Sequence, residues 1–176
     1  TTETYNNNIF AMGTMSSTGS VFLIHASNDT PIKTISNNTT SGTLTRTGSS
    51  GALYCYYNNA ASSGGTETIT NNTFSNISVS GSSALYGIYT NIATTKNRVC
   101  SNNSIDNLTG SAIYNTGVVV GIYAFGSNLN QIHNNTVSNI TAVGTITGIY
   151  FSGVNPSVYD NIVYNITTSG STLRGI

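Results

Sequence analysis

The residues of this chain best able to do acid–base chemistry are five carboxylic acids and two histidines. The acids are scattered along the sequence and no two of them adjoin: Glu3, Asp29, Glu67, Asp106 and Asp160. A polysaccharide hydrolase or lyase needs carboxylates that share one cleft, where they act as general acid and base. Asp106 and Asp160 come closest to a common position, yet they fall in different registers of the repeat that organises the chain. We therefore expect no catalytic residues and a protein that is not an enzyme.

The histidines and cysteines do not form a metal or redox site either. His25 and His133 lie far apart, and neither has a neighbour at a metal-ligand spacing. Calcium would require clustered carboxylates, which the sequence lacks. Cys55 and Cys100 fall in different repeats, so we expect two buried or half-buried thiols and no disulfide framework. No metal and no cofactor are expected.

The composition narrows the possible partners. Asn, Thr, Ser and Gly make up more than half of the 176 residues, charged residues are 6%, and the formal net charge is zero. A neutral chain lacks the basic surface that attracts nucleic acid or an anionic membrane. No apolar run approaches the roughly 18 residues that span a bilayer. We expect neither nucleic-acid binding nor membrane insertion.

An internal repeat carries these residues. Its regular copies begin at Asn72, Asn103, Asn135 and Asn161, and a Ser/Thr/Gly stretch leads from each to a Gly-Ile-Tyr block, cut to Gly-Ile in the last copy. Two degenerate copies surround Asn8 and Asn38, and the aligned Asn residues are 30, 34, 31, 32 and 26 residues apart. The sequence thus predicts one segment over residues 1–176, with degenerate coils in 1–68 and regular coils in 69–176.

The residues within each unit favour strands. The apolar runs are short, rich in β-branched and aromatic residues and bounded by Asn, Gly, Ser and Thr, and no helical i, i+3, i+4 spacing recurs. We interpret each unit as strand, turn, strand and turn. Parallel crossovers are right-handed in almost all proteins. The expected fold is all-β: a right-handed parallel β-helix of about six coils of 26–34 residues.

Stacked coils place equivalent residues about 4.8 Å apart, so repeated Asn side chains can hydrogen-bond from coil to coil. Two structural ladders are predicted, one of Asn72, Asn103, Asn135 and Asn161, the other of Asn76, Asn107, Asn139 and Asn165. Asn also tolerates the left-handed backbone of a tight corner. The alternative for the second set is N-glycosylation, because each of its members begins an Asn-x-Ser/Thr motif.

The Asn-x-Ile-x-Asn-Ile-Thr…Gly-Ile-Tyr units resemble the β-helix repeats of the pectin-lyase-like superfamily. They resemble still more the Asn/Thr-rich repeat arrays of large bacterial secreted and cell-surface proteins. The similarity is good over about residues 69–176 and loose over 1–68. It implies an extracellular β-helical protein, and because the superfamily includes polysaccharide lyases and glycosidases, one alternative is that these are non-catalytic coils of such an enzyme.

One surface feature could bind a ligand. Strand alternation puts Ile and Tyr of each Gly-Ile-Tyr block on opposite faces, so isoleucines inside imply tyrosines outside. The expected stripe consists of Tyr54, Tyr89, Tyr123 and Tyr150. It could stack sugar rings or another rod. The simpler interpretation is that the rings only stabilise the sheet by cross-strand stacking.

These patterns together predict a structural or adhesive segment of a secreted, cell-surface rod or filament. Neither end of the sequence looks like the polar cap that a solenoid needs, so we expect further coils or copies of the same protein, end to end or side by side. The alternative is a carbohydrate-binding module that uses the Tyr stripe, with a polysaccharide as partner.

Overall fold

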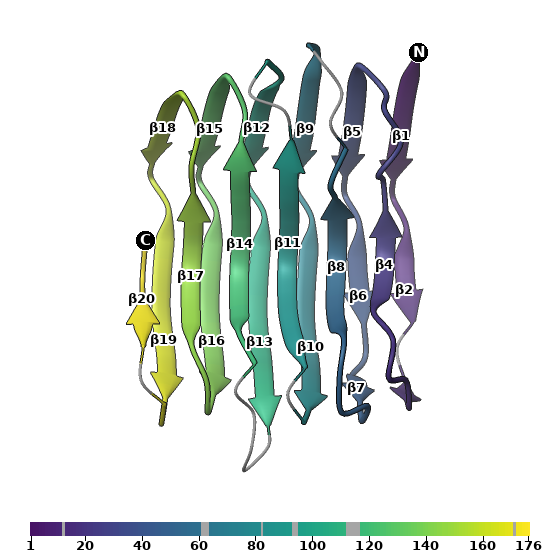
Figure 1. The fold of residues 1–176 in the computed structure, drawn as a ribbon, viewed down its shortest axis with the longest axis vertical. Coiled ribbons are helices and arrows are strands. Elements are labelled where there is room, and N and C mark those ends of the chain that lie inside the picture. The colour runs from purple at the N-terminus through teal and green to yellow at the C-terminus, as the bar shows by residue number, and fades with distance from the viewer. Residues whose placement is uncertain (12, 61–63, 82, 93–94, 112–116, 171) are drawn as a thin grey trace.

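The computed structural model describes residues 1–11, 13–60, 64–81, 83–92, 95–111, 117–170 and 172–176 (Figure 1). Within these ranges there are strands and turns but no helix, and hence no helix that could cross a membrane. All the pairs between the described strands are parallel and join one coil to the next, as in the sheet where β1 (Thr2–Asn6) pairs β5 (Ile32–Ser36) and β5 pairs β9 (Thr66–Thr70). The predicted all-β parallel β-helix is confirmed.

Each coil contributes one strand, or a strand in two short pieces, to each of three sheets. Sheet A stacks β1 (Thr2–Asn6), β5 (Ile32–Ser36), β9 (Thr66–Thr70), β12 (Asn97–Ser101), β15 (Leu129–His133) and β18 (Asn155–Tyr159). Sheet B stacks β2 (Ile9–Ala11), β6 (Thr39–Ser41), β10 (Thr73–Ser80), β13 (Ser104–Ser111), β16 (Thr136–Ala142) and β19 (Ile162–Thr168), with β3 (Thr14–Met15) and β7 (Leu44–Arg46) extending its first coils. Sheet C stacks β4 (Val21–His25), β8 (Ala52–Asn58), β11 (Ala84–Ile92), β14 (Val119–Gly126), β17 (Ile146–Phe151) and β20 (Leu173–Arg174).

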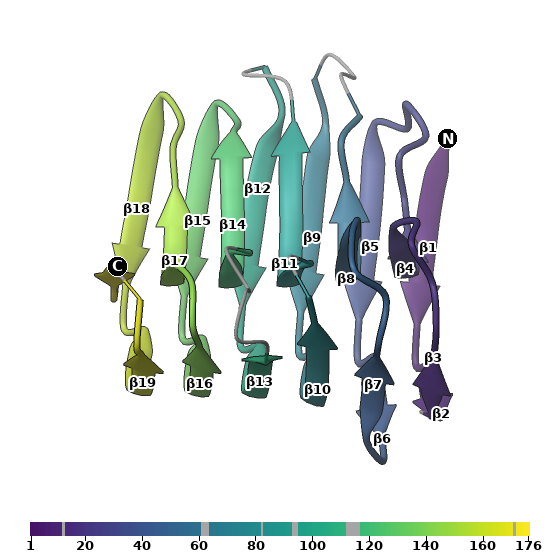
Figure 2. The same ribbon diagram turned by 60° about the horizontal axis from the view of Figure 1, so that its bottom comes forward.

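The chain rises along sheet C, crosses over, descends through sheet A and then sheet B, and moves one strand toward the C-terminus with each circuit (Figures 1 and 2). Seen along the axis from the N-terminus, this path is clockwise, so the helix is right-handed. About five turns separate β1 from β18, close to the number expected.

The coil contains a strand that the sequence pattern did not reveal. Two strands per coil were expected, whereas sheet A adds a third. In β9 and β12 one inward position is charged, Glu67 or Arg98, and the next is apolar, Ile69 or Cys100, while most residues of the outer face are Thr or Asn. The strand was missed because its interior face is partly charged, so apolar–polar alternation does not mark it.

The core is built as the alternation predicted. Ile88, Ile122 and Ile149 of sheet C are at most 1% exposed, while the tyrosines that follow them are only partly buried. Opposite them, sheet B contributes Phe74, Ile105, Val137 and Val163, aligned coil by coil.

The Gly of each Gly-Ile-Tyr block marks a close approach between the two sheets. A Cβ on Gly121 would lie 2.5 Å from Cγ1 of Val137 and 2.7 Å from the carbonyl oxygen of Gly148. Gly87 and Gly148 meet the equivalent neighbours: the carbonyl oxygen of the next glycine in the row, Gly121 or Gly175, and a sheet B side chain, Ile105 or Val163. The recurrence of these glycines in the repeat therefore reflects packing. The backbone of sheet C lies in direct contact with the side chains of sheet B.

The corner between sheets A and B contains a pair of polar residues in every coil. The first of the pair has a positive φ: Asn7, Asn37, Asn71, Asn102, Asn134 and Asp160. The second is the ladder residue. The left-handed conformation expected of the Asn72-type position thus belongs to its predecessor, because the backbone reverses one residue earlier.

Candidate functional site

The first predicted Asn ladder exists and is longer than expected. Nδ2 of each of the first five members donates to Oδ1 of the equivalent Asn in the next coil, at 2.8 Å from Asn8 and Asn38 and at 2.9 Å from the three that follow. The members are Asn8, Asn38, Asn72, Asn103, Asn135 and Asn161. Asn103 shows how fully the group is satisfied: its Nδ2 also donates to the Ile69 carbonyl at 2.9 Å, and its Oδ1 accepts the Asn72 backbone N–H at 3.0 Å. One continuous chain of hydrogen bonds therefore links all six coils; its four middle members are buried, whereas Asn8 is exposed and Asn161 partly buried.

The second predicted row is exposed and less regular. Nδ2 of Asn107 donates to Oδ1 of Asn76 at 2.8 Å, and Asn165 donates to Asn139 at 3.0 Å. Asn139, however, donates to Oδ1 of Asp106 at 2.7 Å. All four Asn residues have φ between 51° and 58°, so each occupies a left-handed position within the sheet B strand. Their exposure leaves the glycosylation alternative open.

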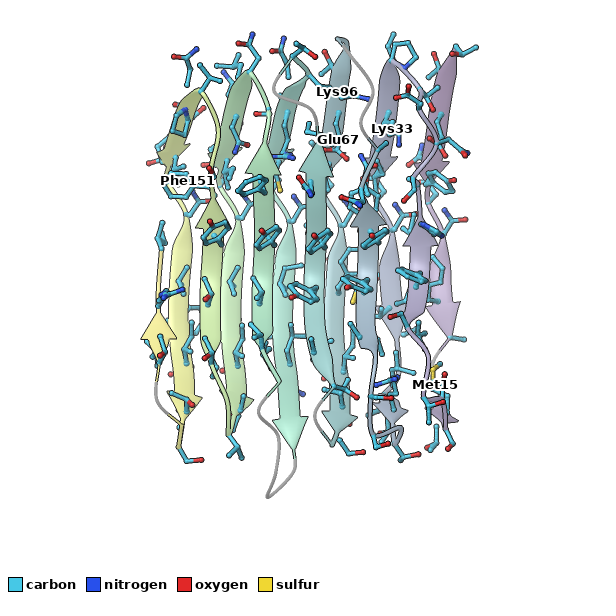
Figure 3. All side chains as sticks on the ribbon, viewed as in Figure 1. Met15, Lys33, Glu67, Lys96 and Phe151 are labelled. Atoms are coloured by element: carbon cyan, nitrogen blue, oxygen red, sulfur yellow. The ribbon has the colours of Figure 1, made fainter. Side chains whose placement is uncertain are left out.

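An unexpected column of charged residues runs through the interior of sheet A. Register pairs Glu3 with Lys33, Lys33 with Glu67, Glu67 with Arg98, and Arg98 with Asn130. Charge alternates from coil to coil, and Lys33, Glu67 and Arg98 have no exposed surface. We call these five residues the charge ladder. Figure 3 shows Glu67 and Lys33 near the end of the sheets where sheet C gives way to sheet A.

Glu67 is the centre of this ladder. Its carboxylate accepts hydrogen bonds from the Tyr56 hydroxyl at 2.6 Å, Asn58 Nδ2 at 2.6 Å and the Thr90 hydroxyl at 2.5 Å, and Nε of Arg98 lies 3.2 Å away. Burial alone would raise the pKa of Glu67, but the Arg98 charge and these three donors outweigh it and hold the pKa below its ordinary value. The group is an ionised carboxylate with every partner supplied by protein, which fits structure rather than proton transfer.

The facing column of sheet C matches the charge ladder in polarity. Asn58 and Thr90 lie in register where the ladder is charged, and Ala124 and Phe151 follow where it becomes neutral. Lys33 donates to Asn58 Oδ1 at 3.1 Å and to the Ala26 carbonyl. Within the charge ladder, the buried charges of Lys33, Glu67 and Arg98 thus lie beside polar groups that can solvate them.

Two further buried cations are held mainly by backbone oxygens. Nη2 of Arg46 donates to the carbonyls of Ser17 and Gly19 at 2.8 Å each. Lys96 donates to the Thr30 carbonyl at 2.6 Å. Burial lowers the pKa of both side chains. The Arg46 contacts tie turns of neighbouring coils together, and Lys96 reaches past one coil to a turn two coils away.

The remaining sequence candidates are kept apart. Asp106 lies in β13 and aligns with Ser138, whose hydroxyl donates to it at 2.7 Å, whereas Asp160 occupies the positive-φ corner column. His133 stacks on Tyr159 at 4.8 Å, outside the core. Among the described residues no group of three or more His, Cys, Asp or Glu could hold a metal ion. Both cysteines are free and buried, as expected.

The outer face of sheet C carries an aromatic ladder two columns wide (Figure 3). One column contains Phe22, Tyr54 and Tyr86, and the other contains His25, Tyr57, Tyr89, Tyr123 and Tyr150. Tyr54 was expected in line with Tyr89, but Tyr57 holds that position. The error arose because β8 carries an extra aromatic residue and only the strand register decides which one aligns.

The rings of this ladder cover one another's faces. Within a column, successive tyrosine rings are 4.8–5.1 Å apart and within 10° of parallel, for example Tyr57–Tyr89 and Tyr89–Tyr123. Between columns they meet edge to face, as do Tyr86 and Tyr89 at 82°. Burial raises the pKa of Tyr54 to about 12. Mutual stacking leaves mostly ring edges and hydroxyls exposed, so the ladder is not a row of open platforms.

No protein-family model, no curated protein and no solved structure matches this chain. The fold and the two interior ladders define its class: a parallel β-solenoid of three-sheet coils.

Proposed function

We propose that this chain is a stiff segment of an extracellular β-helical rod, a structural or adhesive element and not a catalyst. The observation that carries the proposal is the buried Asn ladder, which joins all six coils along the axis. The charge ladder runs parallel to it and adds ion pairs between coils. Both make stretching or shearing the coils apart costly, as a load-bearing rod requires.

The distribution of acids supports a non-catalytic role. Glu67 is enclosed and fully hydrogen-bonded, Glu3 is tied to Lys33 at 3.5 Å, and the two candidate aspartates occupy separate columns. No two of these four acids offer the pair of solvent-accessible carboxylates on one face that glycoside hydrolysis uses.

We also propose kinship with the pectin-lyase-like β-helices and with the Asn/Thr-rich arrays of bacterial cell-surface proteins. The three-sheet coil and the inward Asn at one corner of every coil support it. The carbohydrate-binding alternative is weaker than it was on sequence alone, because sugar rings stack on open aromatic faces and most faces here are already covered.

Single-molecule pulling between the two ends tests the mechanical role. Each coil should yield separately and release about 90–115 Å of chain, from coils of 26–34 residues at about 3.4 Å per residue. Extension at low force with no step of that length would overturn the rod proposal.

Location is tested on the producing cells. An antibody against the folded chain should label the outer surface or the medium of intact cells, with the same signal after gentle lysis. Labelling that appears only after lysis would exclude an extracellular rod.

A further inference from the structure

The aromatic ladder is interrupted on one side, and the interruption forms a groove. In the column of Phe22, Tyr54 and Tyr86, the next three positions are Val120, Thr147 and Arg174. The neighbouring column continues through Tyr123 and Tyr150. Two rungs at about 4.8 Å each therefore lack a ring, which leaves a slot about 10 Å long beside an unbroken aromatic wall.

The slot has defined walls. A groove of about 270 Å³ is lined by Tyr86, Val120, Tyr123, Thr147, Tyr150 and Arg174, with Val118 and Thr145 at its margin. Val120 and Thr147 line the groove and are only 3% and 5% exposed, because the neighbouring side chains already cover most of their surface. The face of Tyr86 that Tyr54 does not cover points along the column toward the slot.

The geometry specifies a flat ring as the occupant. A ring above Val120 would stack on Tyr86 as Tyr54 does on the other side, at 5.0 Å and 9°. The same ring would receive the edges of the neighbouring column, as Tyr54 receives Tyr57 at 64° and Tyr89 at 74°. A sugar ring has no π face to accept those edges, so the second contact favours an aromatic ligand.

The groove also carries a positive charge, that of Arg174. Arg174 is exposed, its guanidinium has no hydrogen bond or ion pair within the described ranges, and none of the groove-lining residues is acidic. Arginine stays protonated at all relevant pH values and binds carboxylates while stacking on aromatic faces. A guanidinium lying over Thr147 would face the far side of a ring bound above Val120.

We propose that this groove binds an aromatic carboxylate, whose ring completes the aromatic ladder between Tyr86 and Arg174. The site is independent of the proposed rod function, because a load-bearing coil does not need it. The slot is open to solvent along one side, so a single ring is held with moderate affinity and exchanges freely.

The test uses 4-hydroxycinnamate as the probe and 4-hydroxycinnamamide as its neutral partner, followed by isothermal titration and saturation-transfer NMR on the intact chain. The acid should bind saturably and more tightly than the amide. Arg174→Gln should remove that preference, a change on the order of tenfold. Raising the salt concentration should weaken the binding of the acid and leave the binding of the amide unchanged.

Val120→Tyr is the decisive variant, because it supplies the missing ring without emptying the core and should abolish binding of the probe. Val99→Tyr, on the outer side of sheet A, is the matched control and should bind normally. Undiminished binding in Val120→Tyr would overturn the proposal, as would no saturable binding by the wild-type chain. Binding of a neutral cello-oligosaccharide, with none of the aromatic acid, would assign the groove to sugars and also overturn it.

Discussion

Replacing Glu67 with Gln should destabilise the protein more than any other single change in the charge ladder. Gln is nearly the same size but carries no charge, so Arg98 would remain buried with its ionic partner lost. Removing one member of a buried ion pair costs about 3–5 kcal/mol. With a loss of about 4 kcal/mol and a slope of about 2 kcal/mol per molar urea, the unfolding midpoint should fall by about 2 M.

Urea unfolding followed by circular dichroism and by tyrosine fluorescence measures this loss. Glu3→Gln is the matched control: it lies in the same column, but its side chain is 13% exposed, so its loss should be less than half as large. In the double variant Glu67→Gln/Arg98→Met, the loss should fall short of the sum of the single losses by about 1–3 kcal/mol. Equal losses at Glu67 and Glu3, or strictly additive losses in the double variant, would refute the role given to the pair.

The same substitution should change the response to acid. The pKa of Glu67 is lowered in the folded protein, so the folded state holds its proton less tightly than the unfolded state does. The stability it contributes is complete above the unfolded pKa, near 4.3, and is lost as the pH falls from there through the folded pKa. Glu67→Gln should therefore flatten the stability profile below about pH 4.3. If the wild-type protein and Glu67→Gln lose stability equally below that pH, the assigned ionisation of Glu67 is contradicted.

Asn103→Ala should cost about 3 kcal/mol or more in urea unfolding, because it leaves several buried hydrogen-bonding groups unpaired, whereas Asn107→Gly, at an exposed positive-φ position, should change stability by less than about 1 kcal/mol. Comparable losses of stability in the two variants would contradict the different roles given to the buried and the exposed Asn rows. Gly121→Ala should cost about 1–3 kcal/mol and lower the melting temperature, since the added methyl meets sheet B; an unchanged melting temperature would show that the sheets can separate locally. Cys55 and Cys100 should resist a thiol reagent until the chain unfolds, because burial raises the pKa of both thiols, and rapid labelling of the native protein would contradict their enclosure.

The charge ladder has a regular spacing in the sequence, but sequence patterns alone did not reveal it. Glu67 stands five positions before Asn72, and Arg98 five before Asn103, as Glu3 does before Asn8. The spacing is as regular as that of the Asn residues themselves. It was passed over because opposite charges and an amide share the column, so no residue type repeats, and because a strand with charges on its inner face was not expected.

The repeat by itself determined the all-β class, the parallel coil of about 30 residues, the inward Ile and outward Tyr of each Gly-Ile-Tyr block, and the first Asn ladder. These follow from periodicity and strand alternation, which are local properties of the chain. Tertiary structure alone decided the third sheet, the pairing of Tyr57 rather than Tyr54 with Tyr89, the burial of the charges and the gap above Val120. Each of these depends on the register between coils, which is set by how turns of unequal length close around a shared core and cannot be counted along one strand.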